Sequence, residues 1–237
     1  MPPVTASASH DDIRQPRAPR LILASASPRR RELLAEAGYA FTVRASGVDE
    51  EAPRATRGPA DLAEQLSFAK AQAVARELAG EGADGSVGDA ASTDTGGSVG
   101  RGAGAIVLGA DTVVAAAGVL YGKALDAGDA RRILTVLLHT PHEVITGVTL
   151  LDAATGRYET AHAVTWVTMT PMTAEELDAY LASNLWAGKA GAYGIQDHDD
   201  KFVQRLEGSF TNVVGLPMEL VSQLLGRWGI EPGAGGP

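Results

Sequence analysis

The chain has 237 residues, 45% of them hydrophobic, so it can bury a sizeable core and is most simply one large domain. It carries 20 basic against 29 acidic residues, a net charge of −9, which argues against nonspecific binding of nucleic acid through a basic surface. It has no cysteine, which excludes disulfides, thiolate metal sites and cysteine catalysis and fits a reducing compartment.

The first residues contain no apolar run of the length that a secretory signal needs, and we expect residues 1–19 to be a disordered tail. The most apolar window, Ala103–Leu120, is interrupted by Asp111 and by three glycines, so it falls short of a membrane span. The sequence therefore predicts a soluble, cytoplasmic protein that binds neither nucleic acid nor membranes.

The segment Leu21–Gly38 predicts a buried strand, a loop of small residues and a helix. Leu21–Ala24 is apolar, Ser25–Ser27 forms the loop, and Pro28 suits the first helical position. Because the first N–H groups of a helix have no intrahelical partner, such a turn can bind a phosphate. A plain N-cap at Ser27 explains the same residues equally well.

Two arginines, Arg29 and Arg30, fall in the first turn of this helix, where the helix dipole disfavours positive charge. A bound polyphosphate would compensate them. The alternative is that both arginines form a solvated face.

A strand is expected at Phe41–Ala45, and three carboxylates follow it at Asp49, Glu50 and Glu51. Acidic clusters at strand ends are usually solvated turns. Carboxylate oxygens are also the ligands that Mg²⁺ and Mn²⁺ prefer, so a metal site is the second interpretation.

A helix over Pro59–Leu78 is predicted by apolar residues at helical spacing. Lys70 lies at the edge of the apolar stripe, where an amine must either extend to solvent or find an anion. Taken alone, the pattern favours extension to solvent. The next segment, Glu81–Gly104, is rich in Gly, Ser, Asp and Thr and is expected to be a flexible surface insertion.

Asp111 lies in an otherwise apolar segment, after the expected strand Ala105–Gly109 and within Ala110–Val114. A carboxylate there is costly unless it is paired or binds a metal ion. An aspartate bonded to the backbone at a strand bend is the alternative.

The second half predicts helices from near Asp126 and at Met218–Trp228, and a hairpin of Glu143–Leu151 with Tyr158–Met169. Thr173 and Glu176 form a capping box for another helix. His142 is expected to be a structural hydrogen-bonding partner. Residues 229–237 are expected to be a disordered tail. Alternating strands and helices predict an α/β (mixed α+β) domain with one long mixed sheet.

Several segments, in this order along Leu21 to about Leu225, resemble the Maf family of nucleoside triphosphate pyrophosphatases. They are SASPRR followed by ELL, LSFAKA, GADTVV, KAGAYGIQ and GSFTNVVGLP. The resemblance implies an elongated, Maf/ITPase-like single domain over residues 20–228, with an active-site cleft between two lobes, in an assembly that is often a homodimer.

The implied reaction is metal-dependent hydrolysis of a nucleoside triphosphate, dTTP or UTP in this branch, to a monophosphate and pyrophosphate. By the same resemblance, Asp111 is the base that activates water and a ligand of Mg²⁺ or Mn²⁺, and Asp49 and Glu50 share the metal. Lys70 and Glu50 join Asp111 as catalytic residues. The residues expected to bind the substrate are Ser25, Ser27, Arg29, Arg30, Lys123, Thr112 and Gln196, of which Arg29, Thr112 and Gln196 set base specificity.

Two departures from the family pattern leave the preferred base open. Ala124 stands where proline usually follows Lys123, and Asp197–Asp200 follow Gln196 where glycine is usual. An alternative function is a nucleotide-binding regulator of cell division with little turnover, which has no need of a water-activating Asp111. A phosphotransferase is a weaker alternative, since no Walker pattern is present.

Overall fold

The computed structural model describes residues 19–50, 55–83, 104–195 and 202–233. Within them the chain forms one mixed sheet in the order β2-β1-β3-β5-β6-β7, with β4 paired to β3. β1 is parallel to β2 and β3, and the other pairs are antiparallel. The strands are β1 (Arg20–Leu23), β2 (Phe41–Val43), β3 (Ala105–Ala116), β4 (Val119–Tyr121), β5 (His142–Asp152), β6 (Tyr158–Met169) and β7 (Val203–Glu207).

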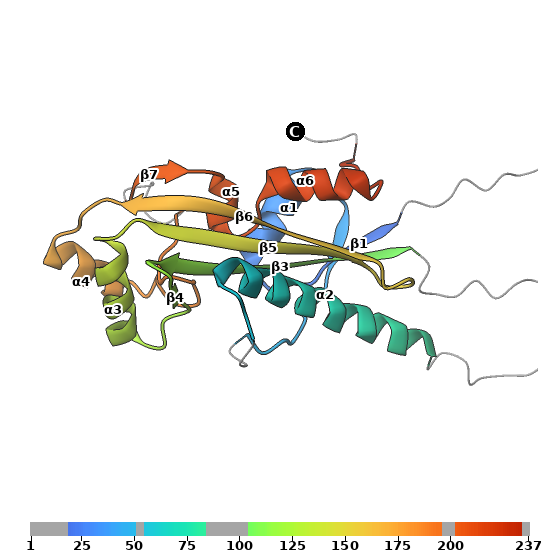
Figure 1. Cartoon of the computed structure of the whole chain (residues 1–237), viewed down its shortest axis with the longest axis horizontal. Helices are drawn as coiled ribbons and strands as arrows, with labels where there is room; N and C mark the ends of the chain where they lie inside the picture. The colour runs from blue at the N-terminus through green and yellow to red at the C-terminus, as the bar shows by residue number, and fades with distance from the viewer. Residues whose placement is uncertain (1–18, 51–54, 84–103, 196–201, 234–237) are drawn as a thin grey trace, which may run out of the picture.

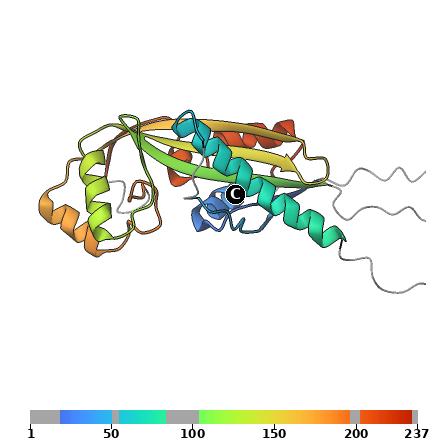
Figure 2. The same cartoon turned by 60° about the horizontal axis from the view of Figure 1, so that its bottom comes forward.

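The helices pack on both faces of the sheet and at one of its ends (Figure 1). α2 crosses one face, α1 and α6 cover the opposite face, and α3 and α4 stand together at the end of the long strands (Figure 2). The expected α/β class, with an elongated mixed sheet, is confirmed. The helices are α1 (Pro28–Glu36), α2 (Pro59–Ala83), α3 (Ala127–Leu137), α4 (Ala174–Ala182), α5 (Phe210–Val214) and α6 (Met218–Arg227).

Two large apolar clusters divide the molecule along its length. One joins α1 and α6 to β1, β3 and β5 through side chains that include Leu34, Leu108, Leu150 and Leu224. The other joins α3 and α4 to the far ends of β3, β5 and β6. These clusters are the cores of two lobes, and the long strands run through both.

Two glycines let the backbone of α2 lie directly on the sheet. A Cβ atom at Gly109 of β3 would stand 2.2 Å from the carbonyl oxygen of Ser67, and one at Gly147 of β5 would stand 2.2 Å from that of Ala63. No side chain fits in such a gap. The close approach brings the middle of α2 over the centre of β3.

The predicted helix signals are confirmed where the structure describes them. Ser27 caps α1 by accepting from the N–H of Arg30, with Pro28 at the first helical position. Asp126 caps α3, and Thr173 forms a capping box with Glu176 at α4. Local hydrogen-bonding chemistry therefore placed these helix starts correctly.

Some boundaries differ from the expectation. α2 continues to Ala83, three residues into the segment expected to be a flexible insertion, and residues 84–103 lie outside the described part. Past residue 228, Ile230 is buried and the N–H of Gly233 donates to the carbonyl of Gly38, so the fold extends beyond the expected start of the C-terminal tail. The expected N-terminal tail lies almost wholly outside the described residues.

Three short elements were not predicted: β4, α5 and β7. With three to five residues each, they are too short for a periodic pattern. β3 is also one continuous strand, so Asp111 lies in mid-strand opposite Gly147 and not at a bend.

No helix in the part of the chain that the structure covers is both long and apolar enough to cross a membrane.

Candidate active site

A cavity of about 570 Å³ opens where the two lobes meet, within the size range of small-molecule sites, roughly 300–1,000 Å³. Its walls come from the loops after β1 and β2, the middle of α2 and β3, the loop after β4, residues 188–195 and the loop after α5. The cleft between two lobes that the family resemblance implies is present in the structure.

The cavity is cationic although the chain is acidic. The described lining residues include five basic side chains and two carboxylates, a formal charge of +3 in a chain whose net charge is −9. A concentration of positive charge in a concave, partly dry site is the usual setting for a polyanion. The seven side chains are Arg29, Arg30, Lys70, Lys123, Lys189, Glu50 and Asp111.

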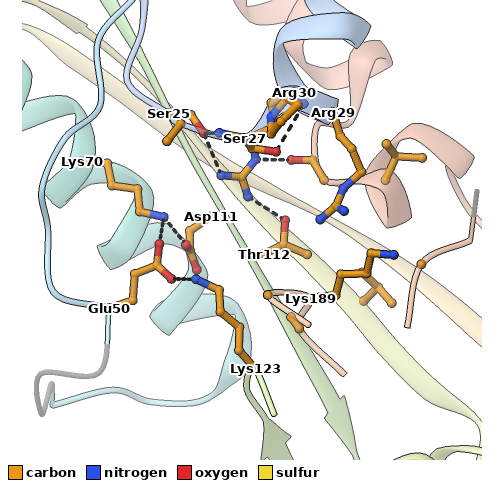
Figure 3. A pocket seen from close by; sticks show the side chains of 18 of the residues that line it. Ser25, Ser27, Arg29, Arg30, Glu50, Lys70, Asp111, Thr112, Lys123 and Lys189 are labelled. Atoms are coloured by element: carbon orange, nitrogen blue, oxygen red, sulfur yellow. Dashed lines mark hydrogen bonds and ion pairs between the residues drawn. The ribbon is translucent and has the colours of Figure 1, made fainter. Parts of the chain in front are cut away.

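Lys70 lies between two carboxylates (Figure 3). Its Nζ is 2.6 Å from Oε1 of Glu50 and 2.5 Å from Oδ1 of Asp111, and the Lys70 and Asp111 side chains are 7% and 8% exposed. Lys123 donates to the other oxygen of Glu50. The expected anion for Lys70 is therefore a pair of protein carboxylates, and extension of its amine to solvent is ruled out.

Burial by itself would raise the pKa of Glu50, but hydrogen bonds from Lys123 and Lys70 outweigh it and lower the pKa to about 2. Glu50 is thus ionised at neutral pH. It links α2 of one lobe to the loop after β4 that leads into the other.

Arg30 is an anchor inside the protein. Its Nε donates to the carbonyl of Gly215 at 2.7 Å, Nη1 to the carbonyl of Ala110 at 2.8 Å, and Nη2 to Oγ1 of Thr112 at 3.0 Å. Burial lowers the pKa of Arg30, and the nearby Asp111 and Glu50 oppose that shift. Most of the guanidinium donors thus bind groups of the protein itself, and the role of Arg30 in holding a triphosphate stays a prediction.

Arg29 and Lys189 project toward the cavity from opposite walls (Figure 3), and both side chains are half-buried. The structure thus separates the two neighbouring arginines, with Arg29 facing the cavity and Arg30 buried behind it. Sequence reasoning missed Lys189 as a site residue. The only feature of the sequence that could have indicated Lys189 was its position at the start of the glycine-containing KAGAYGIQ segment.

The two serines of the first loop support the loop itself. Ser25 Oγ accepts from the N–H of Ser27 and from Arg30, and Ser27 caps α1. Both line the cavity, and their contacts with a phosphate stay predictions. Thr112 also lines the cavity, whereas Gln196 lies outside the described residues.

His142 is confirmed as a structural residue. It is fully buried, its Nδ1 faces the carbonyl of Thr140 at 3.4 Å, and its Nε2 lies 2.8 Å from the hydroxyl of Tyr193. Burial lowers the pKa of His142 to about 4, so the ring is neutral at pH 7. Because a carbonyl can only accept, Nδ1 carries the proton and Nε2 accepts from Tyr193.

The donor set suits a hard divalent ion that binds together with a substrate. Glu50 and Asp111 supply only oxygen atoms, and Mg²⁺ in phosphoryl-transfer sites is commonly held by one or two carboxylates plus phosphate oxygens. No group of three metal-binding side chains occurs in the described part of the chain. Of the two described carboxylates in this loop, Glu50 lines the cavity, whereas Asp49 is exposed and is absent from its wall, and a metal-binding role for either stays a prediction.

Comparison with known proteins agrees with this geometry. Residues 20–228 match the Maf family, described as Maf-like protein. The chain is 41% identical over 212 residues to the dTTP/UTP pyrophosphatase of Moorella thermoacetica, covering 90% of this chain and 96% of that protein. It is 41% identical over 206 residues (86% and 94%) to that of Geobacter metallireducens, and 38% identical over 218 residues (92% and 98%) to that of Symbiobacterium thermophilum.

Proposed function

We propose that this chain, which belongs to the Maf family, hydrolyses nucleoside triphosphates to nucleoside monophosphates and pyrophosphate, with dTTP and UTP as its substrates. The observation that carries the proposal is the buried Asp111 carboxylate, which lies in the wall of a cationic cavity with Lys70 bound to one of its oxygens. Binding alone does not require a carboxylate that activates water.

In the proposed reaction, Asp111 takes a proton from the attacking water. Lys70 donates to its Oδ1, and Oδ2 has no hydrogen-bond partner among the residues that the structure describes. A carboxylate held in this way presents its second oxygen to the cavity in a defined orientation. General-base catalysis by such a group contributes roughly 10²–10⁴-fold to the rate.

The basic side chains of the cavity would bind the triphosphate and neutralise the charge that develops as the bond between the α- and β-phosphates breaks. Arg29, Lys123 and Lys189 line the cavity and are more exposed than the buried Arg30. An Arg can bind phosphate oxygens in a bidentate manner, and a lysine acts as a point charge.

We include a divalent cation, Mg²⁺ or Mn²⁺, in the proposal, with Glu50 and Asp111 as the residues that would hold it. When bound, it would supply additional charge neutralisation to the phosphate oxygens. The oxygen-only donor set supports this part. We also propose that the enzyme acts in the cytoplasm, where it would remove unwanted pyrimidine triphosphates from the nucleotide pool.

The experiment compares the full chain with its Asp111→Asn variant on a panel of ribo- and deoxynucleoside triphosphates, with Mg²⁺, with Mn²⁺ and with chelator, and identifies the products by chromatography. We expect monophosphate and pyrophosphate from dTTP and UTP, a loss of roughly 10²–10⁴-fold in turnover for the variant, and no turnover with chelator. Asp178→Asn, at an exposed position of α4, is the matched control and should keep full activity.

Equal nucleotide binding by the wild type and Asp111→Asn, with no turnover by either, would overturn the enzymatic proposal. It would leave the nucleotide-binding regulator. Turnover that survives chelation would remove only the metal from the proposal.

A further inference from the structure

A chain of hydroxyl groups runs through the cavity wall behind Thr112. Nη2 of Arg30 lies 3.0 Å from Oγ1 of Thr112, which lies 3.0 Å from Oγ1 of Thr146. Thr146 Oγ1 in turn lies 3.2 Å from the backbone carbonyl of Asn212. Thr112 on β3 and Thr146 on β5 are directly opposite each other in the sheet.

The chemistry of the two ends sets the direction of every hydrogen bond in this chain. A carbonyl oxygen can only accept, so Thr146 gives its single hydroxyl proton to Asn212. Thr146 must then accept from Thr112, which gives its own proton away. A guanidinium can only donate, so Thr112 accepts from Arg30.

Neither end of the chain can reverse. Arg30 is held by the carbonyls of Gly215 and Ala110. Asn212 is fully buried, and its Nδ2 donates at 2.9 Å to both the carbonyl of Val144 and Oγ1 of Thr165. The hydroxyl between these fixed groups therefore has a fixed proton.

We propose that Arg30, Thr146 and Asn212 lock the Thr112 hydroxyl as a hydrogen-bond acceptor, so that the cavity selects a substrate with an N–H or O–H donor at this position. Thr112 lines the cavity. Its hydroxyl proton is donated to Thr146 and one of its lone pairs accepts from Arg30, so one lone pair is left to accept a hydrogen bond from a substrate. Thr146 and Asn212 act through Thr112 and are positioning residues.

This inference rests on the proposed function for the identity of the donor. The donors that dTTP and UTP share are the imide N3–H of the base and the 3′-hydroxyl of the sugar. Cytosine carries a lone pair at N3, which would face the lone pair of Thr112. An unmatched polar group in a buried contact lowers affinity by roughly 5- to 100-fold.

The experiment measures kcat/KM and equilibrium binding for UTP, CTP, dTTP and 3′-deoxy-dTTP. Thr146→Val removes the group that takes the Thr112 proton, so the hydroxyl is free to donate. We expect the wild-type preference for UTP over CTP to fall by roughly 5- to 100-fold, mainly because CTP improves. Thr146→Ser should restore the preference, since it keeps the hydroxyl.

Thr149→Val is the matched control. It lies on the same strand as Thr146 and is equally buried, but its hydroxyl contacts Ser67 and Thr160, away from the cavity. A general effect of the lost hydroxyl on folding would appear in both variants. The selectivity should change only in Thr146→Val.

The nucleotide pairs distinguish the two donors. A lost preference for UTP over CTP identifies the base imide, and a lost preference for dTTP over 3′-deoxy-dTTP identifies the sugar hydroxyl. If Thr146→Val changes neither ratio more than Thr149→Val does, the inference is wrong. Binding tests it even if no triphosphate is hydrolysed, so its failure is distinct from a failure of the proposed function.

Discussion

The cavity has two sides that are built differently. The ionic side, Glu50, Lys70, Asp111 and Lys123, consists of alternating charges on four separate segments. The hydrogen-bonded side, Arg30, Thr112, Thr146 and Asn212, has one charge, and its outermost acceptors are backbone carbonyls. Charged side chains on separate segments can exchange partners when an anion enters, whereas backbone carbonyls held in β3 and at α5 cannot.

The difference assigns separate tasks to the two sides. The ionic side supplies the carboxylate and the ammonium groups that phosphate chemistry needs. The hydrogen-bonded side holds the neutral Thr112 hydroxyl in one orientation, which suits recognition of an uncharged part of the substrate. Three predictions test this division, in order of decreasing effect, and a fourth and smaller one concerns a neutral pair beside the two sides.

Removal of the central ammonium should damage the ionic side most. Lys70→Met leaves two carboxylates facing each other without a cation, and we expect turnover to fall by at least roughly 100-fold. Stability should fall by about 3 kcal/mol, the low end for a broken buried pair, because the cavity admits water. Turnover assays and urea unfolding measure the two effects.

Lys123→Met is the matched variant on the same side. Lys123 is 49% exposed and shares Glu50 with Lys70, so its loss should cost less than about 1 kcal/mol of stability. Equal destabilisation by the two variants would contradict the burial argument.

The contact of α2 with the sheet should be the next most sensitive feature, because it holds Lys70 against Asp111. Gly109→Ala places a Cβ 2.2 Å from a backbone oxygen of α2, and we expect a loss of about 3 kcal/mol with a matching loss of activity. Gly80→Ala lies in α2 itself, where no described atom beyond the helix's own nearby backbone comes within 4 Å of the added carbon, and it should instead stabilise by up to about 1 kcal/mol. Thermal unfolding of the two variants tests the pair.

The hydrogen-bonded side should be sensitive to the shape of its cation. Arg30→Lys keeps the charge but loses the planar fork that reaches two carbonyls and two hydroxyls, at a cost of about 2 kcal/mol of stability. Arg29→Lys, one residue earlier, should leave stability within about 0.5 kcal/mol and raise KM for the triphosphate. The reverse result would show that the two arginines have been assigned the wrong way round.

The smallest effect concerns the neutral His142–Tyr193 pair at the edge of the cavity. The pKa of His142 is about 4 in the folded protein and ordinarily 6.5, so between these values the unfolded chain binds a proton that the folded one does not. Stability should therefore fall as pH is lowered, by about 1 kcal/mol between pH 7.5 and 5.5. His142→Gln should lose this dependence in urea titrations, and exposed His139→Gln should keep it. An unchanged slope in His142→Gln would mean that another group titrates.

Local patterns predicted much of the fold. Tyr158–Met169 was predicted as a strand with the bounds that the structure has, and Ser27, Asp126 and Thr173 were identified as helix starts. Each of these signals depends on residues within four positions of one another, so it can be read from the local sequence without knowledge of the tertiary structure. Asp111 also stood out from sequence, because a carboxylate in an apolar run always needs a partner.

The partners themselves were beyond local reasoning. Lys70 finds Asp111, 41 residues away, only because Gly109 and Gly147 admit the backbone of α2 to the sheet. Local reasoning did not distinguish Arg29 from Arg30, because two adjacent residues of a helix differ only in the direction in which their side chains point. The packing of α5 against α1 decides which of the two is buried.

By itself, then, the sequence determined the class of fold, most helix starts, and the residue types that phosphate chemistry requires. The tertiary structure decided which cation is an anchor, which of Asp49 and Glu50 faces the cavity, and which way the Thr112 hydroxyl points. Each of these depends on atoms that are distant in sequence and meet only when strands pair in register and a helix packs on them. Hydrogen bonds and ion pairs act over a few ångströms, so their partners are set by packing and not by sequence distance.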